Sequence, residues 1–156
     1  MNTFFDTNIV VYAVDRSEPR KQPIADTLLY RHLRERTLVT STQVLQEAYN
    51  VLTRKKSLPA SEALGFVREL TKREVVPSSV DFVLRALALC ASVRLSVWDA
   101  LIVQAALDAR CTTLLSEDFH AGMRFGDLEV VNPFVHGVQE PAPSRPAARK
   151  AGRQTR

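Results

Sequence analysis

Short apolar runs along the chain alternate with longer runs in which apolar side chains recur every three or four residues. The short runs, which are typical of buried strands, lie at residues 3–6, 38–41, 75–76, 112–116 and 129–131. The longer runs, which predict helices, lie at residues 9–14, 23–36, 42–56, 61–73, 80–93 and 97–110. Strands separated by helices favour a central, mostly parallel sheet with helices on both faces. The pattern therefore predicts an α/β fold, a three-layer α/β/α domain.

Polar residues indicate where the predicted helices begin. Thr7 or Asn8 is expected to cap the first helix, and Ser79 the fifth. The helix over 97–110 is apolar nearly all round, so we expect it to be central. Residues 119–126 contain no sustained apolar period and are predicted to form a loop or a short helix.

The net charge of +4 is confined to one end of the chain. Residues 137–156 contain five basic residues and one acidic residue, whereas the preceding 136 residues carry 16 of each. This end is rich in Pro, Ala and Arg, a composition typical of disorder. We therefore predict one domain over 1–136 and a disordered basic tail over 137–156. The tail is either a solvated segment or a source of sequence-independent attraction to RNA.

Composition argues against several classes of protein. A chain of 156 residues with 46% hydrophobic residues suits one domain with a real core. No apolar stretch reaches the ~20 residues that span a bilayer, so no membrane segment is predicted. Cys90 and Cys111 lack Cys-x-x-Cys spacing and are expected to be reduced thiols in a cytoplasmic protein. The absence of glycine-rich nucleotide motifs and of His-Glu-x-x-His argues against a nucleotide-cofactor enzyme or a zinc protease.

Four acidic residues stand at positions that a solvated charge does not readily explain. Asp6 and Asp118 follow predicted strands. Glu47 lies on the core side of the third predicted helix, and Asp99 lies in the first turn of the sixth. Ligands of parallel sheets bind at the carboxyl ends of the strands. Burying several carboxylates together is costly unless a cation lies among them, and hard oxygen ligands favour Mg²⁺ or Mn²⁺. The sequence therefore predicts a metal-dependent enzyme that acts on phosphate esters.

Each acid also has a purely structural explanation. Asp99 can complete a capping box with Ser96, and Asp118 can cap the next helical turn. Glu47 can reach solvent from the edge of its helix, and Asp6 can form an Asx-turn. Four such positions in one small α/β domain favour the functional interpretation.

The order and local context of the acids resemble the PIN-domain ribonucleases, in particular the VapC-type toxins of bacterial toxin–antitoxin pairs. The matching segments are Phe5-Asp6-Thr7-Asn8, Gln46-Glu47-Ala48-Tyr49-Asn50-Val51-Leu52, Trp98-Asp99-Ala100-Leu101-Ile102 and Leu114-Leu115-Ser116-Glu117-Asp118-Phe119. Order and spacing together cover about residues 3–131. Each motif is loose by itself, whereas the set is fairly specific. The basic tail after Gly137 is where the chain departs most from the short toxins.

The resemblance implies a site, an activity and partners. It implies that Asp6, Glu47, Asp99 and Asp118 bind Mg²⁺ or Mn²⁺ and carry the hydrolysis of RNA phosphodiester bonds. Thr7, Asn8 and Ser116 are then polar neighbours of the site. It also implies a homodimer and a cognate antitoxin whose tail occupies the active-site groove. From the helical spacing, Asn50 lies beside Glu47 and is placed to hold its orientation.

The fourth acid requires a choice between two neighbours. Side chains alternate along an extended strand, so Ser116 and Asp118 share one side and Glu117 takes the other. We therefore predict Asp118 as the site residue. His120 and Trp98 are weaker candidates for contacts with RNA. We expect His120 to be a surface residue, and Trp98 to pack in the core rather than stack on a base.

Two other functions stay open on the sequence alone. One is a PIN-domain nuclease of RNA processing with no antitoxin, which the presence or absence of a neighbouring antitoxin gene distinguishes. The other is a non-catalytic RNA-binding module, against which the four acids speak. A phosphatase with an aspartate nucleophile is disfavoured because no second Asp follows Asp6 two residues later.

Overall fold

A six-stranded sheet forms the centre of the protein in the computed structural model, which describes residues 1–135. The strands are β1 (Thr3–Phe5), β2 (Leu38–Ser41), β3 (Glu74–Val76), β4 (Thr113–Leu115), β5 (Arg124–Phe125) and β6 (Leu128–Val131). Their order is β3-β2-β1-β4-β6-β5, and only β5 runs antiparallel to its neighbour. The predicted mostly parallel sheet is confirmed.

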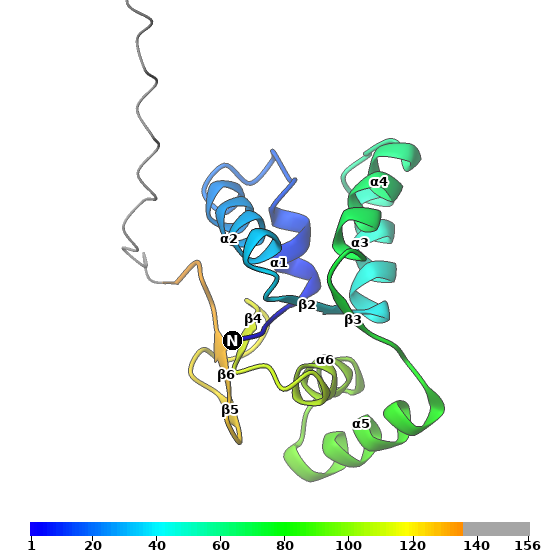
Figure 1. Cartoon of the computed structure of the whole chain (residues 1–156), viewed down its shortest axis with the longest axis vertical. Coiled ribbons are helices and arrows are strands. Elements are labelled where there is room, and N and C mark those ends of the chain that lie inside the picture. The colour runs from blue at the N-terminus through cyan, green and yellow to red at the C-terminus, as the bar shows by residue number, and fades with distance from the viewer. Residues whose placement is uncertain (136–156) are drawn as a thin grey trace, which may run out of the picture.

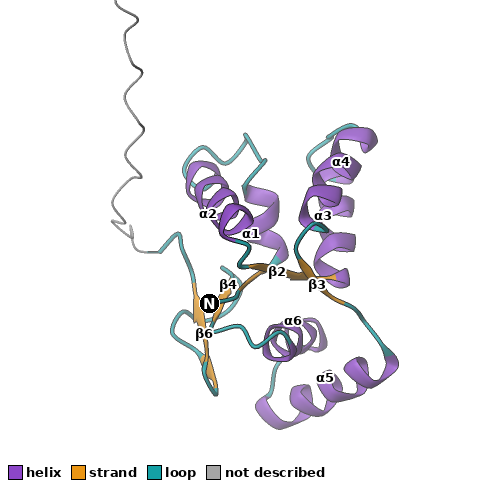
Figure 2. Ribbon diagram, viewed as in Figure 1, coloured by secondary structure: helices purple, strands orange, loops and turns teal. Residues whose placement is uncertain are grey.

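Helices cover both faces of this sheet (Figures 1 and 2). They are α1 (Thr7–Tyr12), α2 (Gln22–Glu35), α3 (Thr42–Arg54), α4 (Ala60–Leu70), α5 (Val80–Val93) and α6 (Val97–Asp108). The first four lie on one side of the sheet, and α5 and α6 lie on the other (Figure 2). Burial of apolar strand and helix faces between these layers supplies the main stabilising free energy. The three-layer α/β/α prediction is confirmed.

The core is formed where the central strands meet the inner helix faces. Phe4 and Phe5 of β1 are fully buried, as are Val39 of β2 and Leu114 of β4. Both sides of these strands are covered, which explains why they appear in the sequence as short continuous apolar runs rather than as alternating ones. The predicted central position of α6 is confirmed, since its buried residues lie on more than one side of the helix.

Two local predictions are wrong. Residues 124–125 form the short strand β5 of a hairpin rather than a loop or helix, and Gly126 takes the left-handed conformation at the turn. Neither Thr7 nor Asn8 caps α1, because Asp6 is the N-cap and its side chain accepts a hydrogen bond from the backbone of the next residue. In contrast, Ser79 caps α5 as predicted.

Three further expectations have different outcomes. Among residues 1–135 no single helix is long and apolar enough to cross a membrane, although α5 and α6 would pass that test together and are bent by 114°. Cys111 is buried, Cys90 is half-buried, and both thiols are free. The predicted disordered tail over 137–156 lies outside the described residues.

Candidate active site

Asp6 lies at the carboxyl end of β1, and the sheet brings β4 alongside it. Phe5 pairs with Leu115, so the ends of the two strands are adjacent. The Asp6 side chain is buried, with 7% of the residue exposed. Its Oδ1 accepts a hydrogen bond from the Thr7 backbone N–H at 2.7 Å, and its Oδ2 accepts one from the Ser116 hydroxyl at 2.6 Å. The position of this carboxylate is therefore set by both strands.

Asp118 faces the same space as Asp6. Its Oδ2 accepts a hydrogen bond from the Asn8 side-chain amide at 2.9 Å, and the same amide nitrogen lies 3.3 Å from Asp6 Oδ2 and 3.3 Å from Ser116 Oγ. The Asp118 backbone N–H also donates to Ser116 Oγ at 3.2 Å. Asp118 is exposed, whereas Asp6 is buried. The two carboxylates thus share one amide, with one of them open to solvent.

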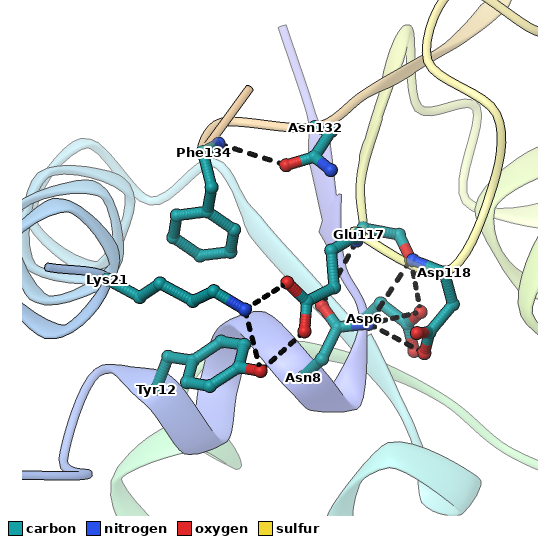
Figure 3. Close-up of polar contacts among 9 residues, drawn as sticks. Asp6, Asn8, Tyr12, Lys21, Glu117, Asp118, Asn132 and Phe134 are labelled. Carbon is teal, nitrogen blue, oxygen red and sulfur yellow. Dashed lines mark hydrogen bonds and ion pairs between the residues drawn. The ribbon is translucent and has the colours of Figure 1, made fainter. Parts of the chain in front are cut away.

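Glu117 points away from that space (Figure 3). Its Oε1 accepts a hydrogen bond from the Tyr12 hydroxyl at 2.5 Å, and its Oε2 lies 2.6 Å from Lys21 Nζ. Ser116 and Asp118 therefore lie on one side of the segment after β4 and Glu117 on the other, as side-chain alternation predicts. The site function of Asp118 stays a prediction.

Glu47 is held close to this pair by two neighbours. Its Oε2 accepts a hydrogen bond from the Thr7 hydroxyl at 2.8 Å, and its Oε1 accepts one from the Gln43 amide at 2.9 Å. Asn50 is exposed, and among the described residues it gives Glu47 no hydrogen bond. The predicted orienting residue is thus replaced by Gln43, one helical turn earlier. The spacing of four residues on α3 was the signal that could have identified it.

Asp99 is the acid that the structure does not join to the others. It lies in the first turn of α6, half-buried, and its backbone N–H donates to the capping Ser96 hydroxyl at 3.1 Å. Among residues 1–135 no hydrogen bond links its carboxylate to the other three acids. Trp98 is 66% exposed, so its predicted packing in the core is wrong. His120 is exposed, as expected.

Burial and two acidic neighbours make Asp6 costly to ionise. Burial raises the pKa of Asp6 from 3.8 to about 6. The hydrogen bonds from Ser116 and Thr7 lower this pKa, while the charges of Asp118 and Glu47 raise it further. The ionised site is therefore electrostatically unfavourable without a compensating positive charge.

The donor atoms of the site suit a hard divalent cation in their chemistry. Asp6, Glu47 and Asp118 supply carboxylate oxygens, which Mg²⁺ and Mn²⁺ prefer. Within residues 1–135 no lysine or arginine is ion-paired with any of the three. As they stand, however, no three acidic, histidine or cysteine side chains in that part of the chain converge into a metal shell. The arrangement is a carboxylate pair with a third carboxylate nearby, turned toward Thr7 and Gln43.

Solved structures with a similar fold include bacterial toxin–antitoxin proteins. A toxin–antitoxin complex from Klebsiella pneumoniae matches with a TM-score of 0.63 and 20% identity, over 85% of this chain and 98% of that one. VapBC2 from Rickettsia felis, bound to a DNA fragment from its promoter, matches with a TM-score of 0.60 and 20% identity, over 83% and 97%. VapC20 from Mycobacterium tuberculosis, a toxin that cleaves the sarcin–ricin loop, matches with a TM-score of 0.58 and 19% identity, over 72% and 87%.

The sequence itself matches one family model. No curated protein sequence matched the chain significantly. The model of the PIN domain matches residues 3–121, which include all four acids predicted for the site. This match covers most of the chain, and the solved structures share its fold. The chain therefore belongs to the PIN-domain family.

Proposed function

We propose that this PIN-domain protein is a metal-dependent endoribonuclease that hydrolyses RNA phosphodiester bonds and acts as the toxin of a toxin–antitoxin pair. The observation that carries the proposal is the buried Asp6 carboxylate beside Asp118 and Glu47, with no cation paired to them among residues 1–135. Such a cluster is costly for folding, and binding of a divalent cation offsets that cost. The buried Asp6 carboxylate beside two other acids is therefore best explained by a role in function.

The residues of the site have distinct proposed roles. Asp6 is the principal ligand of Mg²⁺ or Mn²⁺, because it is buried and fixed by both strands. Asp118 completes the shell from the exposed side, where RNA arrives, and Glu47 either binds the ion or orients the attacking water. When bound, the ion lowers the pKa of a water molecule and stabilises charge on the leaving oxygen.

The polar neighbours have supporting roles. Asn8 and Ser116 hold Asp6 and Asp118 in mutual orientation through their hydrogen bonds. Thr7 and Gln43 hold Glu47. We keep Asp99 as a fourth acid of the site on the strength of its sequence context, at a helix N-terminus that favours an anion.

The test of the proposed activity is cleavage of pooled RNA by the purified full-length protein. We expect cleavage that requires Mn²⁺ or Mg²⁺, stops with a chelator and yields defined 5′ ends on sequencing. The Asp6→Asn variant should be inactive under the same conditions. RNA that stays intact with both ions at millimolar concentration would favour the non-catalytic RNA-binding module instead.

The proposed partners follow from the toxin hypothesis. Two of the similar solved structures are complexes of a toxin with its antitoxin, which supports a cognate antitoxin for this chain. We place part of the antitoxin at the carboxylates, because an arginine supplied by a partner would neutralise their charge and exclude Mg²⁺ or Mn²⁺. We place this activity in the cytoplasm, where RNA is available. If no antitoxin is encoded beside this protein, the alternative of an RNA-processing PIN nuclease is favoured.

We also propose a homodimer, formed through the outer face of α5. Only two residues of this 14-residue helix are buried. Val80, Leu84 and Leu87 are 79%, 61% and 41% exposed, and apolar patches of this kind mark protein interfaces. Together with Ala91 they lie at spacings of four, three and four residues, as in a seam between two packed helices. The order of these spacings is the same in both directions along the helix. Two copies of α5 that pack antiparallel about a two-fold axis can therefore bring these apolar residues into contact.

Replacing Leu84 and Leu87 by Glu should therefore convert a dimer into a folded monomer. In the antiparallel pairing, position 84 of one copy faces position 87 of the other, so the new carboxylates would meet in an apolar interface. Light scattering after gel filtration measures the mass. Leu64→Glu is the matched control, because Leu64 is 44% exposed but lies on α4, on the other side of the sheet. A wild-type protein that is monomeric at all concentrations would contradict this interface.

A further inference from the structure

Trp98 lies on the surface although later residues on the same side of its helix are buried. Ile102 and Ala105 follow it in α6 by four and seven residues, so they share its side of the helix, and both are buried. Trp98 itself is 66% exposed. The layers that cover Ile102 and Ala105 therefore end before the first turn of the helix. Because helical side chains lean toward the N-terminus, the Trp98 ring projects beyond these layers.

The first turn of α6 lies at the carboxyl edge of the sheet, where the carboxylates are. The helix packs against β2 and β4, the two strands that flank β1. Its last turn reaches the amino edge, because the Thr112 N–H, just after the helix, donates to the carbonyl of Asn2, just before β1. The 12 residues of α6 extend about 18 Å along the sheet, whereas the three residues of β4 extend about 10 Å. The N-terminal turn therefore extends past the strand ends on the edge that carries Asp6 and Asp118.

The position of Trp98 gives its exposure a functional meaning. Single apolar side chains on a surface are ordinary and need no explanation. This ring, however, lies at the edge where a phosphodiester must approach Asp6 and Asp118, and the next residue is Asp99, the fourth acid proposed for the site. An aromatic face stacks on any nucleic-acid base, and this contact tolerates changes of sequence. The ring is therefore placed to meet a nucleotide beside the bond at the carboxylates.

We propose that Trp98 is a stacking platform for an unpaired base of the RNA substrate, close to the bond that is cut. This inference rests on the proposed ribonuclease function and extends it to how the substrate is held. A base within a helix has both faces covered by its neighbours, so it must leave that stack to lie on the ring. The stacked base would then fix the position of the backbone next to Asp6 and Asp118, where the carboxylates themselves repel phosphate.

Fluorescence tests this contact directly, because Trp98 is the only tryptophan of the chain. The full-length protein is titrated, without added metal, with labelled oligoadenylate and with an abasic strand that keeps the same sugars and number of phosphates. Anisotropy of the label measures binding of each strand. We expect bound oligoadenylate to quench the Trp98 emission and the bound abasic strand to leave it unchanged. Equal quenching by the two bound strands, or no quenching by bound oligoadenylate, would overturn the proposal.

Substitution of the ring tests its role in cleavage. Trp98→Leu keeps an apolar side chain without an aromatic face, whereas Trp98→Phe keeps a smaller face. We expect Trp98→Leu to raise the KM for RNA about tenfold with nearly unchanged kcat, and Trp98→Phe to recover much of that loss. Tyr30→Leu is the matched control, because Tyr30 is 62% exposed but lies on α2, on the other side of the sheet, and this variant should keep the wild-type KM. A wild-type KM for Trp98→Leu would contradict the stacking role.

Two further measurements separate stacking from other roles of the same position. If Trp98 instead holds Asp99 in place, Trp98→Leu will lose part of the rise in melting temperature that Mn²⁺ causes in the wild type. If Trp98 instead contacts a second copy of the chain, the variant will differ from the wild type in its mass by light scattering. We expect neither change, and either one overturns the contact with a base. RNA that stays intact with the wild type and both ions overturns the proposed nuclease instead, while the fluorescence titration still decides whether Trp98 stacks on bases.

Discussion

Asp118→Asn is expected to lower the rate of RNA cleavage about 10²-fold or more, as found when a group that organises metal and developing charge is lost. The carboxylate of Asp118 is exposed, faces Asp6 and is oriented by the Asn8 amide at 2.9 Å. Asn has nearly the same shape, so the change removes charge and leaves the packing. Cleavage rates at saturating Mn²⁺ are the measurement, and circular dichroism checks that the variant is folded.

Glu117→Gln is the matched control, one residue earlier in the chain. The Gln oxygen can still accept the hydrogen bond from Tyr12, and the lost ion pair with Lys21 is partly exposed, a kind of pair that contributes ~1 kcal/mol or less. We expect this variant to retain most of its activity. If Glu117→Gln is inactive and Asp118→Asn is active, the fourth acid is Glu117 and the proposed arrangement of the site is wrong.

The fold was largely predictable because the physical signals for it are local. Buried strands such as Phe4-Phe5 in β1 and Val39 in β2 form continuous apolar runs, and helix starts such as Ser79 carry a capping side chain. Strand β5 was missed because a two-residue strand has no measurable period. Its pairing with β6 comes from the hairpin turn at Gly126 rather than from apolar patterning.

The candidate site was predictable in its residue types and less so in its contacts. Strand ends and side-chain alternation place Asp6, Ser116 and Asp118 on one side, where the structure has them. The hydrogen bond from Gln43 to Glu47 was not predicted, because Gln43 and Asn50 both lie within one turn of Glu47 and the sequence does not show which of the two side chains reaches it. The exposure of Trp98 also depends on tertiary packing, which a local pattern does not contain.

Divalent metal is expected to raise the melting temperature of the wild-type protein, and Asp6→Asn is expected to weaken that response. A ligand that binds only the native state stabilises it by about 2.7 kcal/mol at a hundredfold excess over Kd. The folded-state pKa of Asp6, about 6, lies above its ordinary 3.8, so stability is lost as the pH rises between these values. At neutral pH ionised Asp6 therefore destabilises the metal-free fold by on the order of 3 kcal/mol. Asn removes that charge, so the metal-free variant should be at least as stable as the wild type.

Asp15→Asn separates this effect from the general consequence of losing a buried carboxylate. Asp15 is also buried, and burial alone would raise its pKa, but Lys56 at 2.6 Å and hydrogen bonds from Ser17 lower it. Its charge therefore stabilises the fold at neutral pH, so Asp15→Asn should lower the melting temperature and leave the metal-induced shift unchanged. Melting curves with and without millimolar Mn²⁺ test both variants. A wild type whose melting temperature changes with neither Mn²⁺ nor Mg²⁺ would refute the metal site, because a ligand that binds only the native state must raise that temperature.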